Sequence, residues 1–211
     1  MKTTLYSLIA AAAACGLASA AETAYSTPVG YEDLSVDPGT NYLGVRVHES
    51  TVAAGQLQGA AGTVLSVPDG VADALVAGTT YILEINSGVA GVSGVITLVS
   101  SWDAGADTIT TDDDLPAILA GFVGDEDFSL RPVSTISTVF GATNSAGLTS
   151  AASFAGSDQV WLFNGAGYDK YFYAAGGFGQ PSAWKLDDGT VVDPDAINLV
   201  YTDAIVLVSV N

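Results

Sequence analysis

Carboxylates are the most numerous side chains here that could do chemistry, since the 211 residues include 23 Asp and Glu but only one His and one Cys. A glycoside hydrolase needs only two carboxyl groups. A Ser-His-Asp triad would have to use His48, yet no serine lies in the Gly-x-Ser-x-Gly pattern of a nucleophile elbow. A zinc site needs several His or Cys ligands. The residue types therefore favour a protein that is not an enzyme, with a carboxylate-pair glycoside hydrolase as the minor alternative.

Two ionisable residues stand out by their neighbours. Glu84 lies between Leu83 and Ile85, where burial would raise the pKa of a carboxyl group. Alternation along a strand nevertheless places Glu84 on the side that faces solvent. His48 is interpreted as an ordinary polar residue at the end of a strand. Neither residue is assigned a catalytic role.

Four aspartates are the candidate metal ligands: Asp112, Asp114, Asp125 and Asp127. Calcium takes six to eight oxygen ligands, so two acidic loops that meet in space could hold one ion. The spacing of these residues does not match the helix-loop-helix calcium motif. Aspartate is also a common turn residue. The sequence therefore predicts no cofactor, with calcium as the open alternative.

Aromatic residues are concentrated between residues 161 and 184. Exposed aromatic rings can stack on sugars or on another protein. Tyr171 and Tyr173 share one face of a strand, and together with Trp184 they are the predicted ligand-binding residues. Packing in the core is the default explanation for these rings, and binding would need one set of them to remain at the surface.

The local pattern predicts an all-β fold. Short apolar runs are separated by Gly, Asp, Asn and Pro, as in β-sandwiches and barrels. The expected strands are 42–48, 62–67, 79–85, 94–100, 108–111, 127–131, 159–163, 168–174, 182–186, 196–200 and 205–210, and short helical turns are expected at 71–77, 115–120 and 136–140. Runs 160–163 and 205–208 are apolar at every position, which predicts central strands that are covered on both faces.

The chain is expected to divide into a signal peptide and two small antiparallel β modules, barrel-like or sandwich-like. Residues 1–20 have a basic start, an apolar run and small residues before the expected cleavage point. Residues 21–133 form the first module, 134–158 a connecting segment that packs on the surface, and 159–211 the second module. Cleavage would remove Cys15, so no disulfide is expected. Lipid attachment at Cys15 is the less favoured alternative.

The charge balance excludes two classes of partner. The formal net charge is −18, with only five basic residues. Nucleic acids and anionic lipid surfaces are bound through clusters of Lys and Arg, which are missing from this sequence. The acidity is interpreted as a means of keeping an apolar chain in solution.

Short motifs spread along the chain resemble those of an uncharacterised family of secreted β-rich proteins from Verrucomicrobia-type bacteria. These motifs lie at 28–31, 43–48, 52–55, 81–88, 127–132, 139–141, 146–148, 158–164 and 168–173, with Trp184. The resemblance implies export, β structure and a bacterial origin. It implies no activity and no catalytic residues, and the acidic end of this chain departs from the pattern.

These observations together predict a secreted, non-enzymatic β protein, extracellular or attached to the cell envelope, with a structural or adhesive role. The first alternative is a polysaccharide-binding module that uses the aromatic residues around 168–184. The expected partners are extracellular polysaccharide or further copies of the chain. Residues 204–210 are apolar and could pair with the sheet of a neighbour, or else complete their own sheet. No membrane-spanning segment is expected in the mature chain.

Overall fold

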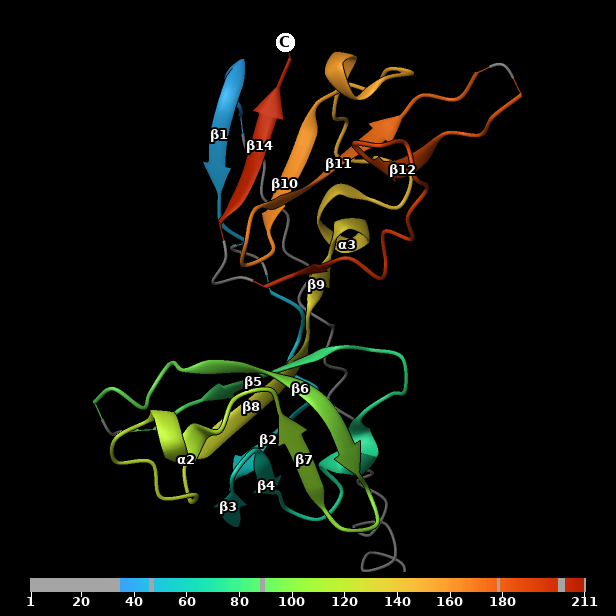
Figure 1. The fold of residues 1–211 in the computed structure, drawn as a ribbon. Helices are drawn as coiled ribbons and strands as arrows, with labels where there is room; N and C mark the ends of the chain where they lie inside the picture. Colours follow the sequence, from blue (N-terminus) through green and yellow to red (C-terminus); the bar gives the residue numbers. More distant parts are fainter. Residues whose placement is uncertain (1–34, 46–47, 88–89, 178, 201–203, 211) are drawn as a thin grey trace, which may run out of the picture.

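A computed structural model describes residues 35–45, 48–87, 90–177, 179–200 and 204–210 (Figure 1). Strands in three sheets dominate these residues, which confirms the all-β prediction. The strands are β1 (Gly39–Leu43), β2 (Ala53–Gln56), β3 (Gly59–Ala61), β4 (Val64–Ser66), β5 (Tyr81–Ile85), β6 (Ile96–Asp103), β7 (Thr108–Thr111), β8 (Asp127–Pro132), β9 (Ser134–Thr135), β10 (Gln159–Phe163), β11 (Tyr168–Ala174), β12 (Ala183–Leu186), β13 (Asn198–Leu199) and β14 (Ile205–Ser209). The helices are η2 (Ala72–Ala74), α2 (Leu115–Ile118), α3 (Ile136–Phe140) and η3 (Phe154–Gly156). In these ranges, no helix is long and apolar enough to cross a membrane.

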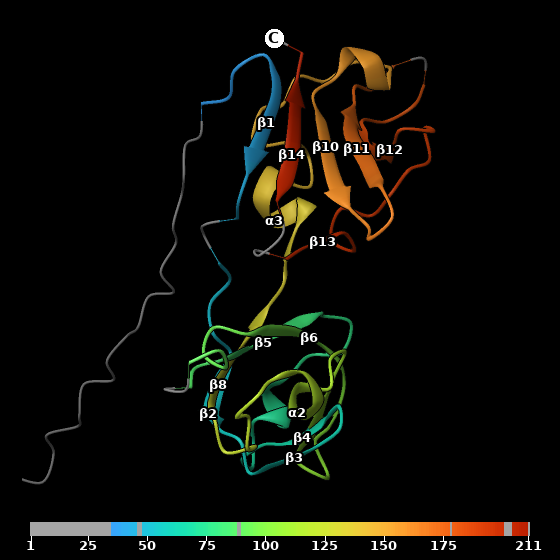
Figure 2. The same ribbon diagram turned by 60° about the vertical axis from the view of Figure 1, so that its left-hand side comes forward.

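Seven antiparallel strands form the first unit, residues 52–133, which we call the inserted module. Their order is β2-β8-β5-β6-β7-β4-β3. The sheet curls around its own apolar core (Figure 2), in which the side chains of Leu83 and Phe128 are buried. The ladder between β6 and β7 shifts register between Val99 and Ser101. Such a bulge increases the local twist and so helps the sheet to curl.

Five antiparallel strands, in the order β1-β14-β10-β11-β12, form the main sheet of the second unit. We call this unit the host module; it contains the described residues of 35–45 and 134–210. Its inner face packs Val160, Tyr171 and Leu207 against α3 and the segment around Leu199. We call the opposite side of this sheet the outer face. The pairing of β9 with β13 forms the third, two-stranded sheet.

The strand pairing corrects two of the expected boundaries. The sequence places residues 39–43 in the first module, but β1 pairs with β14 in the host sheet. Residues 134–158 were expected to be a surface connection, but Ile136 and Phe140 lie in the host core. The described part of the chain therefore begins in the host module, forms the inserted module, and returns to the host module through β8 and β9 (Figure 1). The C-terminal strand β14 completes its own sheet, between β1 and β10.

Local sequence signals account for the helical turns. Asp114 caps α2 because its Oδ1 accepts a hydrogen bond from the backbone N–H of Ala117 at 3.1 Å. Thr135 and Thr138 form a reciprocal capping box at the start of α3. Both helices begin at the residues predicted from the sequence. The cap of α3 fixes the orientation of the helix that covers the inner face of the host sheet.

Candidate functional site

A row of side chains crosses four strands on the outer face of the host sheet. Tyr42 in β1 lies opposite Val206 in β14, Val206 lies opposite Trp161 in β10, and Trp161 lies opposite Lys170 in β11. Residues that face each other directly in a ladder project from the same side of the sheet. These four side chains therefore form one continuous band across β1, β14, β10 and β11.

The next rung of the β10–β11 ladder on the same face adds two more aromatic rings. Phe163 lies opposite Tyr168, with the ring centroids 5.6 Å apart, and Tyr168 also contacts Trp161 at 6.0 Å. The exposed fractions are 74% for Tyr42, 58% for Phe163 and 46% for Tyr168. We call Tyr42, Trp161, Phe163 and Tyr168 the aromatic platform. Large exposed apolar side chains gathered on one face are typical of binding surfaces.

A cation and a hydrogen bond hold Trp161 in place at the centre of the platform. The Nζ atom of Lys170 lies 4.4 Å from the centroid of the Trp161 ring, which is a cation–π contact. The indole Nε1 of Trp161 donates a hydrogen bond to Oε1 of Gln159 at 3.0 Å. The amide of Gln159 in turn donates to the carbonyl of Phe154. These contacts restrict the rotamers of Trp161, so a ligand would meet a preformed ring.

One short segment covers only part of the outer face. Phe154 in η3 packs edge-on against Phe172 with the ring centroids 5.6 Å apart, and Phe172 is buried. Phe163 is exposed although the continuous apolar run 160–163 predicted cover on both faces. That prediction was wrong for β10: on its inner face Val160 is buried and Leu162 is partly buried, and part of its outer face is open. For β14, both Val206 and Leu207 are buried as expected.

The three aromatic residues predicted to bind a ligand project from the other side of the same sheet. Trp184 is 1% exposed and Tyr171 is 6% exposed, and both belong to the host core, with Tyr173 packed against them. Burial, reinforced by the charge of Asp169, raises the pKa of the Tyr171 hydroxyl. These rings stabilise the host module, and the predicted binding role of Tyr171 and Trp184 is corrected because both side chains are buried. The sequence did not show which set of alternating residues faces the core, because both faces of β10 and β11 carry aromatic residues.

The four predicted calcium ligands lie at two places, the start of α2 and the start of β8. Asp114 caps α2, and Asp112 lies just before it. Asp125 and Asp127 line a shallow cavity of about 220 Å³ next to Glu126. The Glu126 carboxylate, which is 4% exposed, accepts hydrogen bonds from the N–H groups of Val123 and Gly124, each at 2.8 Å. Within the part of the chain that the structure describes, no three His, Cys, Asp or Glu residues group to hold a metal ion.

Glu84 and His48 lie close to the same guanidinium group. Glu84 Oε2 accepts a hydrogen bond from Arg131 Nη2 at 2.7 Å, and both side chains are largely shielded from water. Glu84 therefore forms an ion pair across β5 and β8, where alternation had predicted a solvent-facing acid. The pKa of His48 is lowered by partial burial and by the charge of Arg131, while the charge of Glu84 acts in the opposite direction.

The lowered pKa of His48 predicts a small pH dependence of stability. The folded state binds the histidine proton less readily than the unfolded state, whose pKa is close to the ordinary 6.5. Stability is therefore lost as the pH falls through 6.5 toward the lowered pKa of the folded state, and this loss is complete below it. We expect His48→Gln to reduce the drop in Tm between pH 7.5 and pH 5 by about 2 °C, a small effect because most of the His48 side chain is exposed. Equal drops for both proteins in a thermal melt would contradict this assignment.

Comparisons of the chain with protein-family models, with curated proteins and with solved structures found no match.

Proposed function

We propose that this protein is a secreted, non-enzymatic β protein with an adhesive role, and that it binds an uncharged extracellular polysaccharide through the aromatic platform. The observation that carries the proposal is the exposure of Tyr42, Phe163 and Tyr168 on one sheet face, around a fixed Trp161. Aromatic rings pack against the apolar faces of sugar rings, and a tyrosine hydroxyl can bond to sugar hydroxyls.

The dimensions of the platform suit a chain-like ligand. Neighbouring strands are roughly 4.8 Å apart, so the band from β1 to β11 extends over three such spacings. The rings of Trp161 and Tyr168 are inclined by 51°, and those of Phe163 and Tyr168 by 63°. The surface is therefore ridged, which fits successive sugar rings of one strand better than the flat face of a crystalline polymer.

Charge narrows the class of polysaccharide. The net charge of −18 repels polymers that carry carboxylate or sulfate groups. The cation at the platform, Lys170, already lies against Trp161. An uncharged glycan is not repelled by this charge. Its affinity for the platform is therefore expected to depend little on salt concentration.

Substitution of the exposed rings tests this function. We expect Phe163→Ala and Tyr168→Ala each to weaken binding to soluble β-glucan or to chitin oligosaccharides about three- to tenfold, because each ring supplies part of the contact. The Tm should stay close to that of the unchanged protein, because both side chains are exposed. Affinity electrophoresis and calorimetry would measure the binding. Val123→Ala, which changes a 73% exposed residue of the inserted module, is the control.

Two results would contradict the proposal. One is the absence of binding to a panel of neutral glucans, mannans and chitin oligosaccharides. The other is binding that survives the double variant Phe163→Ala/Tyr168→Ala. If sedimentation instead showed a dimer that dissociates in the double variant, the platform would be a contact between copies of the chain.

A further inference from the structure

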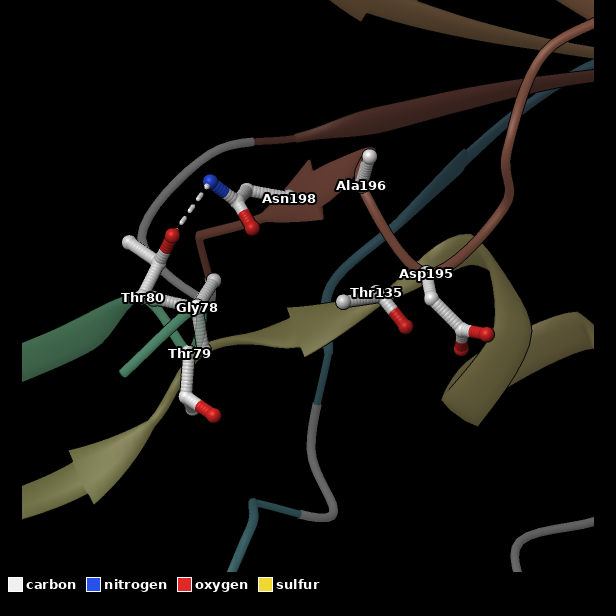
Figure 3. A pocket seen from close by; sticks show the side chains of 8 residues that line it. Gly78, Thr79, Thr80, Thr135, Asp195, Ala196 and Asn198 are labelled. Atoms are coloured by element: carbon white, nitrogen blue, oxygen red, sulfur yellow. Dashed lines mark hydrogen bonds between the residues drawn. The ribbon is translucent and has the colours of Figure 1, made fainter. Parts of the chain in front are cut away.

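A polar pocket lies where the inserted and host modules meet. It has a volume of about 350 Å³, which is within the range of sites for small ligands. Figure 3 shows its lining: Gly78, Thr79 and Thr80 come from the segment before β5, Thr135 from β9, Asp195 and Ala196 from the segment that leads into β13, and Asn198 from β13 itself. Val133 completes the wall.

Backbone hydrogen bonds fix both walls of this junction pocket. On the inserted side, the N–H of Val133 donates to the carbonyl of Thr80 at 2.9 Å. On the host side, the N–H of Ser137 donates to the carbonyl of Pro194 at 3.1 Å, which ties the segment with Asp195 to α3. The pairing of Asn198 with Thr135 sets the floor between them. The backbone that carries the polar groups is therefore held in position before any ligand arrives.

The contact across the junction is weak enough for a ligand to replace it. The Asn198 amide donates to the Thr80 hydroxyl at 3.4 Å, near the upper limit for a hydrogen bond (Figure 3). The Asp195 carboxylate makes no hydrogen bond or ion pair within the residues that the structure describes. Small residues, Gly78 and Ala196, leave the space in front of these groups open.

We propose that the junction pocket binds a single uncharged sugar ring. Its lining combines a carboxylate and hydroxyl oxygens as acceptors with amide and hydroxyl donors, which matches the paired donor and acceptor character of sugar hydroxyls. No basic side chain lines the pocket, and Asp195 repels anions. The lining also has no aromatic ring, so hydrogen bonds supply the recognition. This site stands on observations separate from those of the platform.

The pocket can be tested by nuclear magnetic resonance on the chain from residue 21. D-glucose, D-galactose, D-mannose and N-acetyl-D-glucosamine would each be titrated to tens of millimolar. One of them is expected to shift the amide signals of Thr79, Thr80, Ala196 and Asn198. Asp195→Ala should weaken that binding roughly tenfold, since it removes a charged hydrogen-bond acceptor. Ala196→Trp, a change at an exposed position, should block the pocket without unfolding the protein.

Matched controls separate this proposal from the platform. Asp73→Ala makes the same change of charge at an exposed residue of the inserted module and should leave the titration unchanged. Phe163→Ala should also leave it unchanged. The proposal is overturned if none of the four sugars shifts the pocket signals, or if Asp195→Ala and Ala196→Trp bind as well as the unchanged protein.

Discussion

Replacement of Trp184 by alanine is expected to lower the free energy of unfolding of the host module by about 3–5 kcal/mol, as for other large buried aromatic residues. The ring is 1% exposed and packs between Phe140 and Tyr173, with centroids 6.2 and 5.6 Å away. Its Nε1 also donates a hydrogen bond to the carbonyl of Gly141 at 3.0 Å, and the substitution removes this bond, which leaves the carbonyl with the N–H of Asn144 as its donor. Urea denaturation followed by circular dichroism would measure the loss.

The matched variant is Trp161→Ala, on the opposite face of the same sheet. Trp161 is half-buried, so its loss should cost clearly less stability than the loss of Trp184. It should also impair glycan binding, because Trp161 is the centre of the platform. If Trp161→Ala proved as destabilising as Trp184→Ala, the assignment of inner and outer faces would be wrong.

A fragment of residues 48–133 is expected to fold by itself, whereas residues 134–211 are not expected to fold without β1. Every strand pair of the seven-stranded sheet lies within β2 to β8, and so does its apolar core. The host sheet, in contrast, needs β1 to cover the edge of β14. Val45, which follows β1, also contributes a buried side chain to the host core. Amide spectra of the two fragments would show which has dispersed, folded signals.

Complementation makes this second prediction specific. A synthetic peptide of residues 35–45 should restore folded signals to the fragment 134–211, because it supplies β1 and Val45 in trans. A scrambled peptide of the same composition is the control. Folding of 134–211 without any peptide, or failure of 48–133 to fold, would contradict the insertion topology.

The local elements were predictable because short stretches of sequence determine them. Tyr81, Leu83 and Ile85 alternate along β5 and all three are buried in the core, as the period of two predicted. Asp114 marks the start of α2 because a side-chain cap needs only the next turn of chain. The partner of β1 was not predictable, since Thr40 and Val208 meet across most of the chain and no local pattern specifies that pairing. The types of the elements were therefore predicted correctly, but the boundaries of the modules were not.

The binding face was missed for a related reason. The sequence located the aromatic residues on neighbouring strands but gave no information on which face another layer would cover. Cover depends on where α3 and Phe154 pack, and these positions follow from contacts between distant segments. Trp161 and Lys170 offered a usable signal, because an alternating strand places Lys170 on the same side as Tyr168 and opposite to Tyr171. Because a lysine side chain is rarely buried, Lys170 indicates which face of the sheet is exposed to solvent.

The antiparallel pairing of β1 with β14 also determines how the host sheet responds to tension. Gly39, at the start of β1, lies opposite Ser209, at the end of β14. A pulling force between these two ends loads the bonds of that pair first and then each pair in turn, so the strands peel apart and do not shear. The inserted module lies beyond the last pair, Leu43 with Ile205, and carries no load until β1 has detached. Under tension, β1 is therefore the part of the molecule that yields first.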